Sequence, residues 1–302
     1  MCLAAGVSRA GYYRQWEESE PEEAEMGVRA EMQKIVVTHR RRYGYRRVTA
    51  ELHRQGMKVN HKRVLRLMRS DNLLAVRRRK YILTTDSRHD YQVAMNLAGR
   101  MTVTGINQLW IADITYIRLR RECLYLAVVI DRFSRKVIGW ALDGTLAARL
   151  PVAALEQAIA QRQPPPGVVH HSDQGVQYAS EEYRAVLAAH GMTPSMSQPA
   201  NPYDNAACES FMKTLKQEEI YCRQYQDRQE LAGCVEDFLE NYYNRQRLHS
   251  ALDYNTPEEF EQTLAAAAAE TGDMSKTTAT LKYFKRPKEK QKPGRRPETE
   301  QT

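Results

Sequence analysis

Three closely spaced segments rich in Ile, Val, Leu, Tyr and Trp constrain the fold of this chain more than any other feature of its sequence. They span residues 109–117, 124–130 and 136–142, and short polar stretches separate them. Runs of β-branched and aromatic residues of this length are typical of strands, and short connections join antiparallel neighbours. The sequence therefore predicts a three-stranded antiparallel meander.

Helices and short strands alternate after this meander. The apolar pattern predicts helices over 147–161, 180–190 and 204–218, with short strands over 168–171 and 192–196. Three strands followed by alternating helices and strands form a mixed sheet with helices packed on it. We therefore predict an α/β domain over residues 107–262, with the ribonuclease-H-like order of a mixed five-stranded sheet and flanking helices.

The 302-residue chain has a formal net charge of +8, and this charge is unevenly distributed. Residues 28–100 hold 19 Lys and Arg against 5 Asp and Glu, whereas residues 107–260 hold 15 against 20. Clustered positive charge attracts a phosphate backbone through Coulomb energy and counterion release, although it also serves simply to keep a small domain soluble. We interpret the basic segment as a DNA-binding module that precedes an acidic core.

Three short helices fit the basic module, which we place at residues 28–75. Breaks at Gly44 and Gly56 separate them, and Asn60 is the predicted N-cap of the last helix, over about residues 61–70. Short helices joined by turns, with a basic last helix, are typical of a helix-turn-helix domain, although a basic solvated helix that enters no groove is the alternative. The predicted DNA contacts of this module and of the basic run that follows it are Arg46, Arg47, Lys62, Arg63, Arg66, Arg77, Arg78, Arg79 and Lys80.

The other segments are predicted to lie outside these two domains. Residues 1–27 suggest a helical fragment with an acidic linker, and residues 76–106 a basic linker. Residues 263–302 are predicted to be a disordered basic tail, because residues 271–302 hold 9 Lys and Arg, 4 Asp and Glu, and almost no large apolar groups.

Neither the apolar runs nor the cysteines indicate a secreted or membrane protein. No stretch approaches the roughly 20 consecutive apolar residues of a membrane span. The 5 cysteines form no CxxC pair and no spacing of the structural zinc type. We therefore expect a cytoplasmic protein with reduced thiols and no membrane partner.

Three acidic residues stand where the predicted fold would bring them together. Asp113 lies within the first apolar strand, Asp173 follows the strand at 168–171, and Glu209 lies early in the last core helix. Clustered carboxylates repel one another, so each would have a raised pKa unless a divalent cation neutralised the group. Hard oxygen ligands favour Mg²⁺ or Mn²⁺, and two such ions in one site can promote displacement at a phosphodiester.

Each charged residue also has a simpler explanation when it is taken alone. A strand aspartate can be an ion-pair partner, an aspartate near a glycine is common in turns, and a helical glutamate is ordinary. Lys213 and Lys216 follow Glu209 at i+4 and i+7, which predicts one helix face that addresses both metal and phosphate. The alternative for both lysines is an exposed, solvated helix face.

Short motifs spread over most of residues 5–260 match one known family. They are residues 7–13, 42–47, 110–117, 125–131, 171–173 and 201–209, followed by Tyr243, Asn244 and Arg247. Asp173 and Glu209 have 35 residues between them, and Lys216 stands seven residues after Glu209. On these motifs the chain resembles the downstream-frame (OrfB-type) transposases of insertion-sequence family three, whose core is similar to retroviral integrase.

This resemblance implies a DDE-type polynucleotidyl transferase that cleaves DNA strands and transfers them to a target. It implies that Asp113, Asp173 and Glu209 bind two Mg²⁺ or Mn²⁺ ions and that Lys216 contacts DNA. Gln174 stands where relatives often have arginine. The implied partners are double-stranded DNA at the element ends and at the target, further copies of this chain on that DNA, and an upstream-frame protein, all at a bacterial nucleoid.

Two other functions remain open from the residues alone. A ribonuclease-H-like nuclease that only hydrolyses would need the same three acids, because the acids do not distinguish water from a 3′-hydroxyl as the nucleophile. A catalytically silent DNA-binding regulator would need only the basic module.

Overall fold

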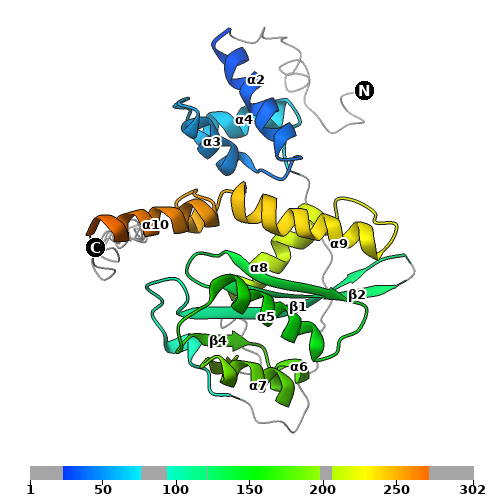
Figure 1. Ribbon diagram of the computed structural model, residues 1–302. Helices are drawn as coiled ribbons and strands as arrows, with labels where there is room; N and C mark the ends of the chain where they lie inside the picture. The colour runs from blue at the N-terminus through cyan, green and yellow to red at the C-terminus, as the bar shows by residue number, and fades with distance from the viewer. Residues whose placement is uncertain (1–22, 76–93, 121, 198–205, 272–302) are drawn as a thin grey trace, which may run out of the picture. The chain divides into compact units, whose positions relative to one another are not determined.

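The computed structural model describes residues 23–75, 94–120, 122–197 and 206–271 (Figure 1). It divides into two compact units, which fall within residues 1–79 and 80–302. The predicted N-terminal fragment up to residue 22, the basic run at 77–80 and the predicted tail from residue 272 lie outside the described residues.

The first unit contains the three predicted helices, α2 (Glu23–Thr38), α3 (Tyr45–Arg54) and α4 (His61–Ser70). The Asn60 side chain accepts a hydrogen bond of 2.8 Å from the backbone N–H of Lys62, which confirms the predicted N-cap. Apolar side chains of all three helices are buried together, which is how so short a segment gains a core. They are Met32, Ile35, Val36, Val48, Leu52, Val64, Leu67 and Met68.

The second unit is built on a five-stranded sheet whose order is β3-β2-β1-β4-β5. Its strands are β1 (Leu109–Arg118), β2 (Cys123–Asp131), β3 (Val137–Asp143), β4 (Val169–Ser172) and β5 (Thr193–Met196). The first three pair antiparallel, whereas β4 is parallel to β1 and β5 is parallel to β4. This is the predicted mixed sheet, with the meander at one side and the two short parallel strands at the other.

The side chains of β1 alternate between two environments, as the twofold period of a strand requires. Trp110 and Ala112 belong to the core under α5 (Arg149–Arg162) and α7 (Glu181–Ala189). Asp113 lies between Ala112 and Ile114 and so projects from the opposite face of the strand. Helix α8 (Ala206–Leu215) contacts β1, and Figure 1 shows α5 and α8 on opposite sides of the sheet.

Gly139 lets α5 pack directly on β3. A Cβ atom at this position would lie 2.2 Å from the carbonyl oxygen of Ala154 and 2.8 Å from the Cβ of Ala158, both on α5. Because the nearest atom belongs to a helix backbone, Gly139→Ala forces α5 away from the sheet. We expect the free energy of unfolding to fall by about 1–3 kcal/mol, the usual cost of overpacking a core, as measured by denaturant titration.

Gly233→Ala is the matched control for this prediction. Gly233 lies in α9 (Arg228–Glu236), and a Cβ atom there would meet nothing within 4 Å. Since alanine is favoured over glycine within a helix by up to about 1 kcal/mol, this variant should be as stable as the wild type or more stable. An unchanged unfolding midpoint in Gly139→Ala would show that the contact of α5 with β3 is not as close as described.

Side chains close the outer edge of the sheet. The Asn244 side chain accepts a hydrogen bond from the backbone N–H of Val137 at 3.0 Å and donates one to its carbonyl oxygen at 2.9 Å. Further along β3, Arg228 donates to the carbonyl oxygen of Leu142 at 3.0 Å. An edge strand covered in this way offers fewer backbone groups to a strand of another molecule.

Two predicted boundaries need correction. Part of the predicted linker packs on the second unit: the backbone N–H of Leu97 donates to the Ser195 hydroxyl at 2.9 Å, and Ile106 packs against the cluster that contains Phe133. The predicted core ended at residue 262, but α10 (Pro257–Thr271) continues past it. Apolar contacts hold this helix against the rest of the unit. A buried ion pair of 2.5 Å between Arg162 on α5 and Glu261 also holds it.

The remaining elements are short. They are η1 (Ala98–Arg100), α6 (Val176–Ala179), the π-helical segments η2 (Lys216–Ile220) and η3 (Asp237–Tyr243), and η4 (Ser250–Leu252). Among the described helices, none has the length and apolar character needed to cross a membrane.

Candidate active site and nucleic-acid interface

The parallel pairing of β1 and β4 brings two of the predicted acids together. Ile111 on β1 pairs with His171 on β4, and this is the last residue pair between the two strands. Asp113 and Asp173 each stand two residues further on, where the strands separate. The two aspartates therefore stand at equivalent positions beyond the last residue pair of these neighbouring parallel strands.

Backbone donors hold one oxygen of each aspartate. The Oδ1 atom of Asp113 accepts a hydrogen bond of 2.9 Å from the N–H of Ile114. The Oδ1 atom of Asp173 accepts one of 3.0 Å from the N–H of Gly175, and a Cβ at Gly175 would lie 3.0 Å from that oxygen. The absence of a side chain at Gly175 therefore lets the loop after β4 fold closely around Asp173.

The two histidines before Asp173 are buried and hydrogen-bonded. His171 lies between the hydroxyls of Ser195 and Ser197, with ring nitrogen to oxygen distances of 2.9 and 3.1 Å. His170 is 3.0 Å from the hydroxyl of Tyr183, and burial lowers the pKa of His170 to about 3. These contacts indicate that both histidines are structural residues of β4.

Electrostatics link the third acid to the two aspartates. The pKa of Asp113 is raised from 3.8 to about 8, first by burial and next by the charge of Asp173, while Glu209 raises it further. The backbone N–H of Ile114 and the charge of Lys216 lower it, but they do not offset the rise. Asp113 is therefore close enough to Asp173, Glu209 and Lys216 for their charges to act on it, and the two acids outweigh the lysine.

The negative charge around Asp113 favours a divalent cation, but the carboxylates are farther apart than the ligands of a bound metal ion. Carboxylate oxygens are hard ligands, and a bound cation would remove the repulsion that raises the pKa of Asp113. Within residues 23–75, 94–120, 122–197 and 206–271, however, no three His, Cys, Asp or Glu side chains are grouped closely enough to hold a metal ion. Glu209 is exposed on α8, so its side chain has the freedom to approach the aspartates.

Lys216 is turned toward β1 at the start of the π-helical segment η2. Its Nζ atom lies 5.1 Å from the centroid of the Tyr116 ring, a cation–π distance, and its charge acts on Asp113. Burial lowers the pKa of Lys216, and Asp113 counters this effect. Lys213 is exposed on α8. Of the two predicted lysines, Lys216 is therefore the one at the acids.

The predicted DNA contacts of the first unit differ in their exposure and in their partners. Lys62 and Arg46 are exposed, and the Arg46 guanidinium donates to the Tyr45 hydroxyl at 3.1 Å. Arg47 is partly buried, with its guanidinium 5.7 Å from the centroid of the Tyr43 ring. The residues at 77–80 lie outside the described part of the chain.

Arg63 and Arg66 on α4 have a structural partner that the sequence did not reveal. Both bind the carboxylate of Glu25 on α2, at 3.4 and 2.5 Å, and Glu25 itself is buried. Glu25 belongs to an acidic run that was interpreted as a linker, and no periodic signal marked it as part of a helix. These two arginines hold α4 against α2, although the Arg66 side chain is still 66% exposed.

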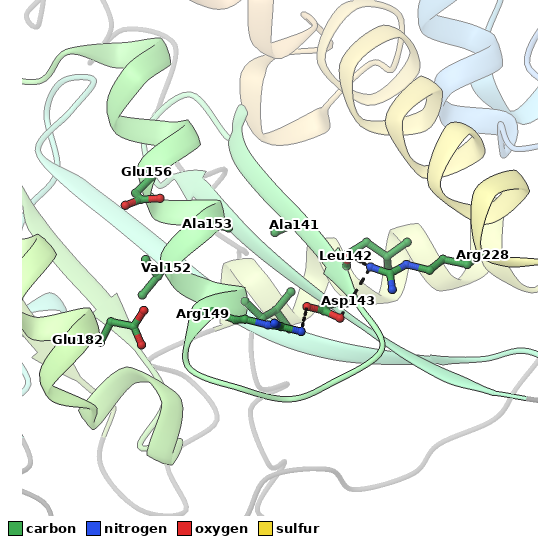
Figure 2. A pocket seen from close by; sticks show the side chains of 10 residues that line it. Ala141, Leu142, Asp143, Arg149, Val152, Ala153, Glu156, Glu182 and Arg228 are labelled. Atoms are coloured by element: carbon green, nitrogen blue, oxygen red, sulfur yellow. Dashed lines mark hydrogen bonds and ion pairs between the residues drawn. The ribbon is translucent and has the colours of Figure 1, made fainter.

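A cavity of about 620 Å³ opens at the β3 edge of the sheet, away from these acids (Figure 2). Its charged lining is already paired in part, because Asp143 binds Arg149 at 3.0 Å and Arg228 at 3.7 Å. Glu156 and Glu182 lie on its other side in Figure 2. The lining includes none of the three predicted acids, so the cavity is not part of the candidate active site.

Comparison with known families divides the chain in the same way as the structure. Residues 22–81 match a family described as an HTH-like domain. Residues 104–202 and 190–257 match two families that are each described as an integrase core domain.

Curated relatives match the chain over most of its length. The insertion element IS600 uncharacterized 31 kDa protein of Shigella sonnei is 36% identical over 89% of this chain and 100% of its own length. The transposase for insertion sequence element IS904 of Lactococcus lactis is 40% identical over 74% of this chain and 89% of its own length. The transposase InsF for insertion sequence IS3A of Escherichia coli is 36% identical, with coverage of 86% and 92%.

A solved structure gives a weaker match. The HTLV-2 integrase catalytic core domain in complex with magnesium is 18% identical, with a TM-score of 0.39, and the match covers 50% of this chain and 94% of that one. No further property of the chain follows from a likeness of this size. The relatives and the matched domains together show that the chain belongs to the IS3 family of insertion-sequence transposases, which joins an HTH-like domain to an integrase-like core.

Proposed function

We propose that this protein cleaves DNA at the ends of an insertion sequence and joins the freed 3′-hydroxyls to a target phosphodiester, as a DDE-type polynucleotidyl transferase. One observation carries the proposal: Asp113 and Asp173 each stand two residues beyond the last paired residues of β1 and β4, and the charges of Asp173 and Glu209 both act on Asp113. Negative charges gathered around a partly buried carboxylate are costly unless a cation joins them.

Asp113, Asp173 and Glu209 are the proposed ligands of two Mg²⁺ or Mn²⁺ ions. When bound, such ions activate an attacking oxygen and stabilise the departing one. The backbone N–H of Ile114 donates to one carboxylate oxygen of Asp113, and that of Gly175 donates to one oxygen of Asp173. These hydrogen bonds orient each carboxylate, so that its second oxygen is the one proposed to bind metal. Glu209 completes the set by a side-chain movement from α8, so we expect metal binding to order this side chain.

Lys216 is the proposed phosphate contact at the reacting strand. Its position over Tyr116 on β1 limits the freedom of a long side chain, which lowers the entropy lost when it binds a phosphate oxygen. In the first unit, the exposed Lys62 and Arg46 are the proposed contacts to the phosphates of duplex DNA, with Lys213 on α8 and the run at 77–80 as further contacts.

The proposed partners follow from this chemistry. Two element ends and a target must be held at once, so we propose that several copies of the chain assemble on the DNA. An upstream-frame protein is a further proposed partner for recognition of the element ends. The proposed location is the bacterial cytoplasm, at the nucleoid.

A strand-joining assay tests the proposal. Purified protein is incubated with labelled duplex that carries the terminal repeats found beside its own coding sequence, with Mg²⁺, with Mn²⁺ or with EDTA. We expect nicked and joined products only when the divalent ion is present. Nicked products without any joined strand would indicate a hydrolytic nuclease instead, and retarded mobility of the DNA without either product would indicate a silent regulator.

A further inference from the structure

The hydroxyl of Tyr178 is buried without a hydrogen-bond partner among the residues that the structure describes. The side chain is 3% exposed, on the short helix α6 that follows the Asp173 loop. Leaving a buried hydroxyl unpaired lowers the stability of the fold, whereas phenylalanine would fill the same space at no such cost. A buried hydroxyl that has no partner within the described part of the metal-free protein indicates a partner that it gains in another state, such as the metal-bound one.

The surroundings of this hydroxyl identify that partner. The Tyr178 ring packs edge-on against Tyr183 with centroids 5.3 Å apart. Burial raises the pKa of Tyr178, and the charges of Tyr183, Asp173 and Asp113 raise it further, with a contribution from Cys208 on α8. The phenol is therefore a protonated donor, close enough to Asp173 and Asp113 for their charges to act on it.

Tyr183 is a structural tyrosine in the same core and serves as a comparison for Tyr178. It is as deeply buried as Tyr178, and its hydroxyl is 3.0 Å from the Nε2 atom of His170. The two tyrosines thus have similar burial and a shared ring contact, but only Tyr183 has a hydrogen-bond partner among the described residues.

We propose that Tyr178 is a positioning residue whose hydroxyl donates a hydrogen bond to the Asp173 carboxylate when that carboxylate holds a divalent ion. This inference rests on the proposed function of Asp173. Carboxylates that bind metals are usually fixed by a second hydrogen-bond donor, and loss of such a donor weakens metal binding about 10- to 100-fold. Asp173 already receives one donor from Gly175. The Tyr178 ring follows three residues later and lies close by, because a Cβ atom at Gly175 would be 3.7 Å from the Cδ2 atom of Tyr178.

The test compares Tyr178→Phe with Tyr183→Phe in the full chain. Mn²⁺ binding is followed by the electron paramagnetic resonance signal of the free ion, and thermal unfolding is measured in EDTA. We expect Tyr178→Phe to bind Mn²⁺ about 10- to 100-fold more weakly, with an unfolding midpoint in EDTA that is unchanged or higher. Tyr183→Phe should show the reverse, with a lower midpoint and unchanged Mn²⁺ affinity, because it loses the bond to His170.

A third variant separates the failure of this inference from the failure of the proposed function. If the wild type binds Mn²⁺ and Asp113→Asn does not, while Tyr178→Phe binds as the wild type does, then the role of Tyr178 is wrong and the metal site stands. If the wild type itself binds no Mn²⁺, both proposals are wrong. A lower midpoint in EDTA for Tyr178→Phe with normal Mn²⁺ affinity would assign Tyr178 to packing alone.

Discussion

Asp113→Asn is expected to lower the rate of strand joining by about a thousandfold or more while the protein stays folded. Metal ions contribute several kcal/mol to the stabilisation of charge in a transition state, and about 4 kcal/mol corresponds to a factor of about a thousand in rate. Asparagine keeps the shape of the side chain but removes the charge that binds the cation. The measurement is the initial rate of joined product in Mg²⁺, for equal amounts of each variant.

Asp143→Asn is the matched control for this prediction. Asp143 is an aspartate at the end of β3, in the same meander, and it pairs with Arg149 and Arg228, whose side chains are 65% and 50% exposed. Because ion pairs of exposed side chains contribute about 1 kcal/mol or less, this variant should join strands at nearly the wild-type rate. Normal joining by Asp113→Asn, or by Glu209→Gln, would end the assignment of these acids.

The pH dependence of stability checks that the Asp113→Asn variant is folded. The pKa of Asp113 is raised from 3.8 to about 8 in the folded state. Between these two pH values, the Asp113 carboxyl group is therefore protonated in the folded protein and ionised in the unfolded chain. The free energy of unfolding of the metal-free protein therefore falls as the pH rises from about 4 to about 8. Asp113→Asn lacks this loss, so its unfolding midpoint at pH 8 in EDTA should equal or exceed that of the wild type.

The arrangement of the sheet could be predicted because it depends on local patterns. The apolar runs gave the positions of β1, β2 and β3, and their short connections gave the antiparallel pairing. The approach of Asp113 to Asp173 depends in addition on the register between β1 and β4. A slip of one residue would turn a strand's side chains to the other face, and a strand of four residues carries too little pattern to exclude it.

Contacts between distant residues could not be predicted, because no local period reports them. Glu25 binds two arginines about 40 positions later in the chain, so residues that were assigned to DNA also hold the first unit together. Asn244 replaces a missing strand partner for Val137, 107 positions away. A π-helical segment begins at Lys216 and changes the number of residues per turn. The i+7 spacing from Glu209, which assumes an α-helix, therefore does not fix the direction of the Lys216 side chain.

Arg247→Met should destabilise the second unit strongly. Arg247 is 5% exposed, and its guanidinium forms two hydrogen bonds of 2.8 Å with the Glu218 carboxylate. A third, of 3.4 Å, reaches Thr214, and the ring of Tyr243 lies 5.6 Å away. Removal of one partner leaves the Glu218 charge with little compensation, which usually costs about 3–5 kcal/mol. We expect the thermal unfolding midpoint to fall by roughly 10 °C.

The double variant Arg247→Met/Glu218→Leu separates the charge effect from a packing effect. If the loss in the single variant comes from the uncompensated carboxylate, removal of both charges should recover most of it, since apolar replacements of a buried ion pair are often neutral or stabilising. If the midpoint of the double variant stays as low as that of Arg247→Met, the geometry of the pair itself holds η2 in place. In that case strand joining at low temperature should also be impaired, because Lys216 begins η2 and Glu209 lies on the helix before it.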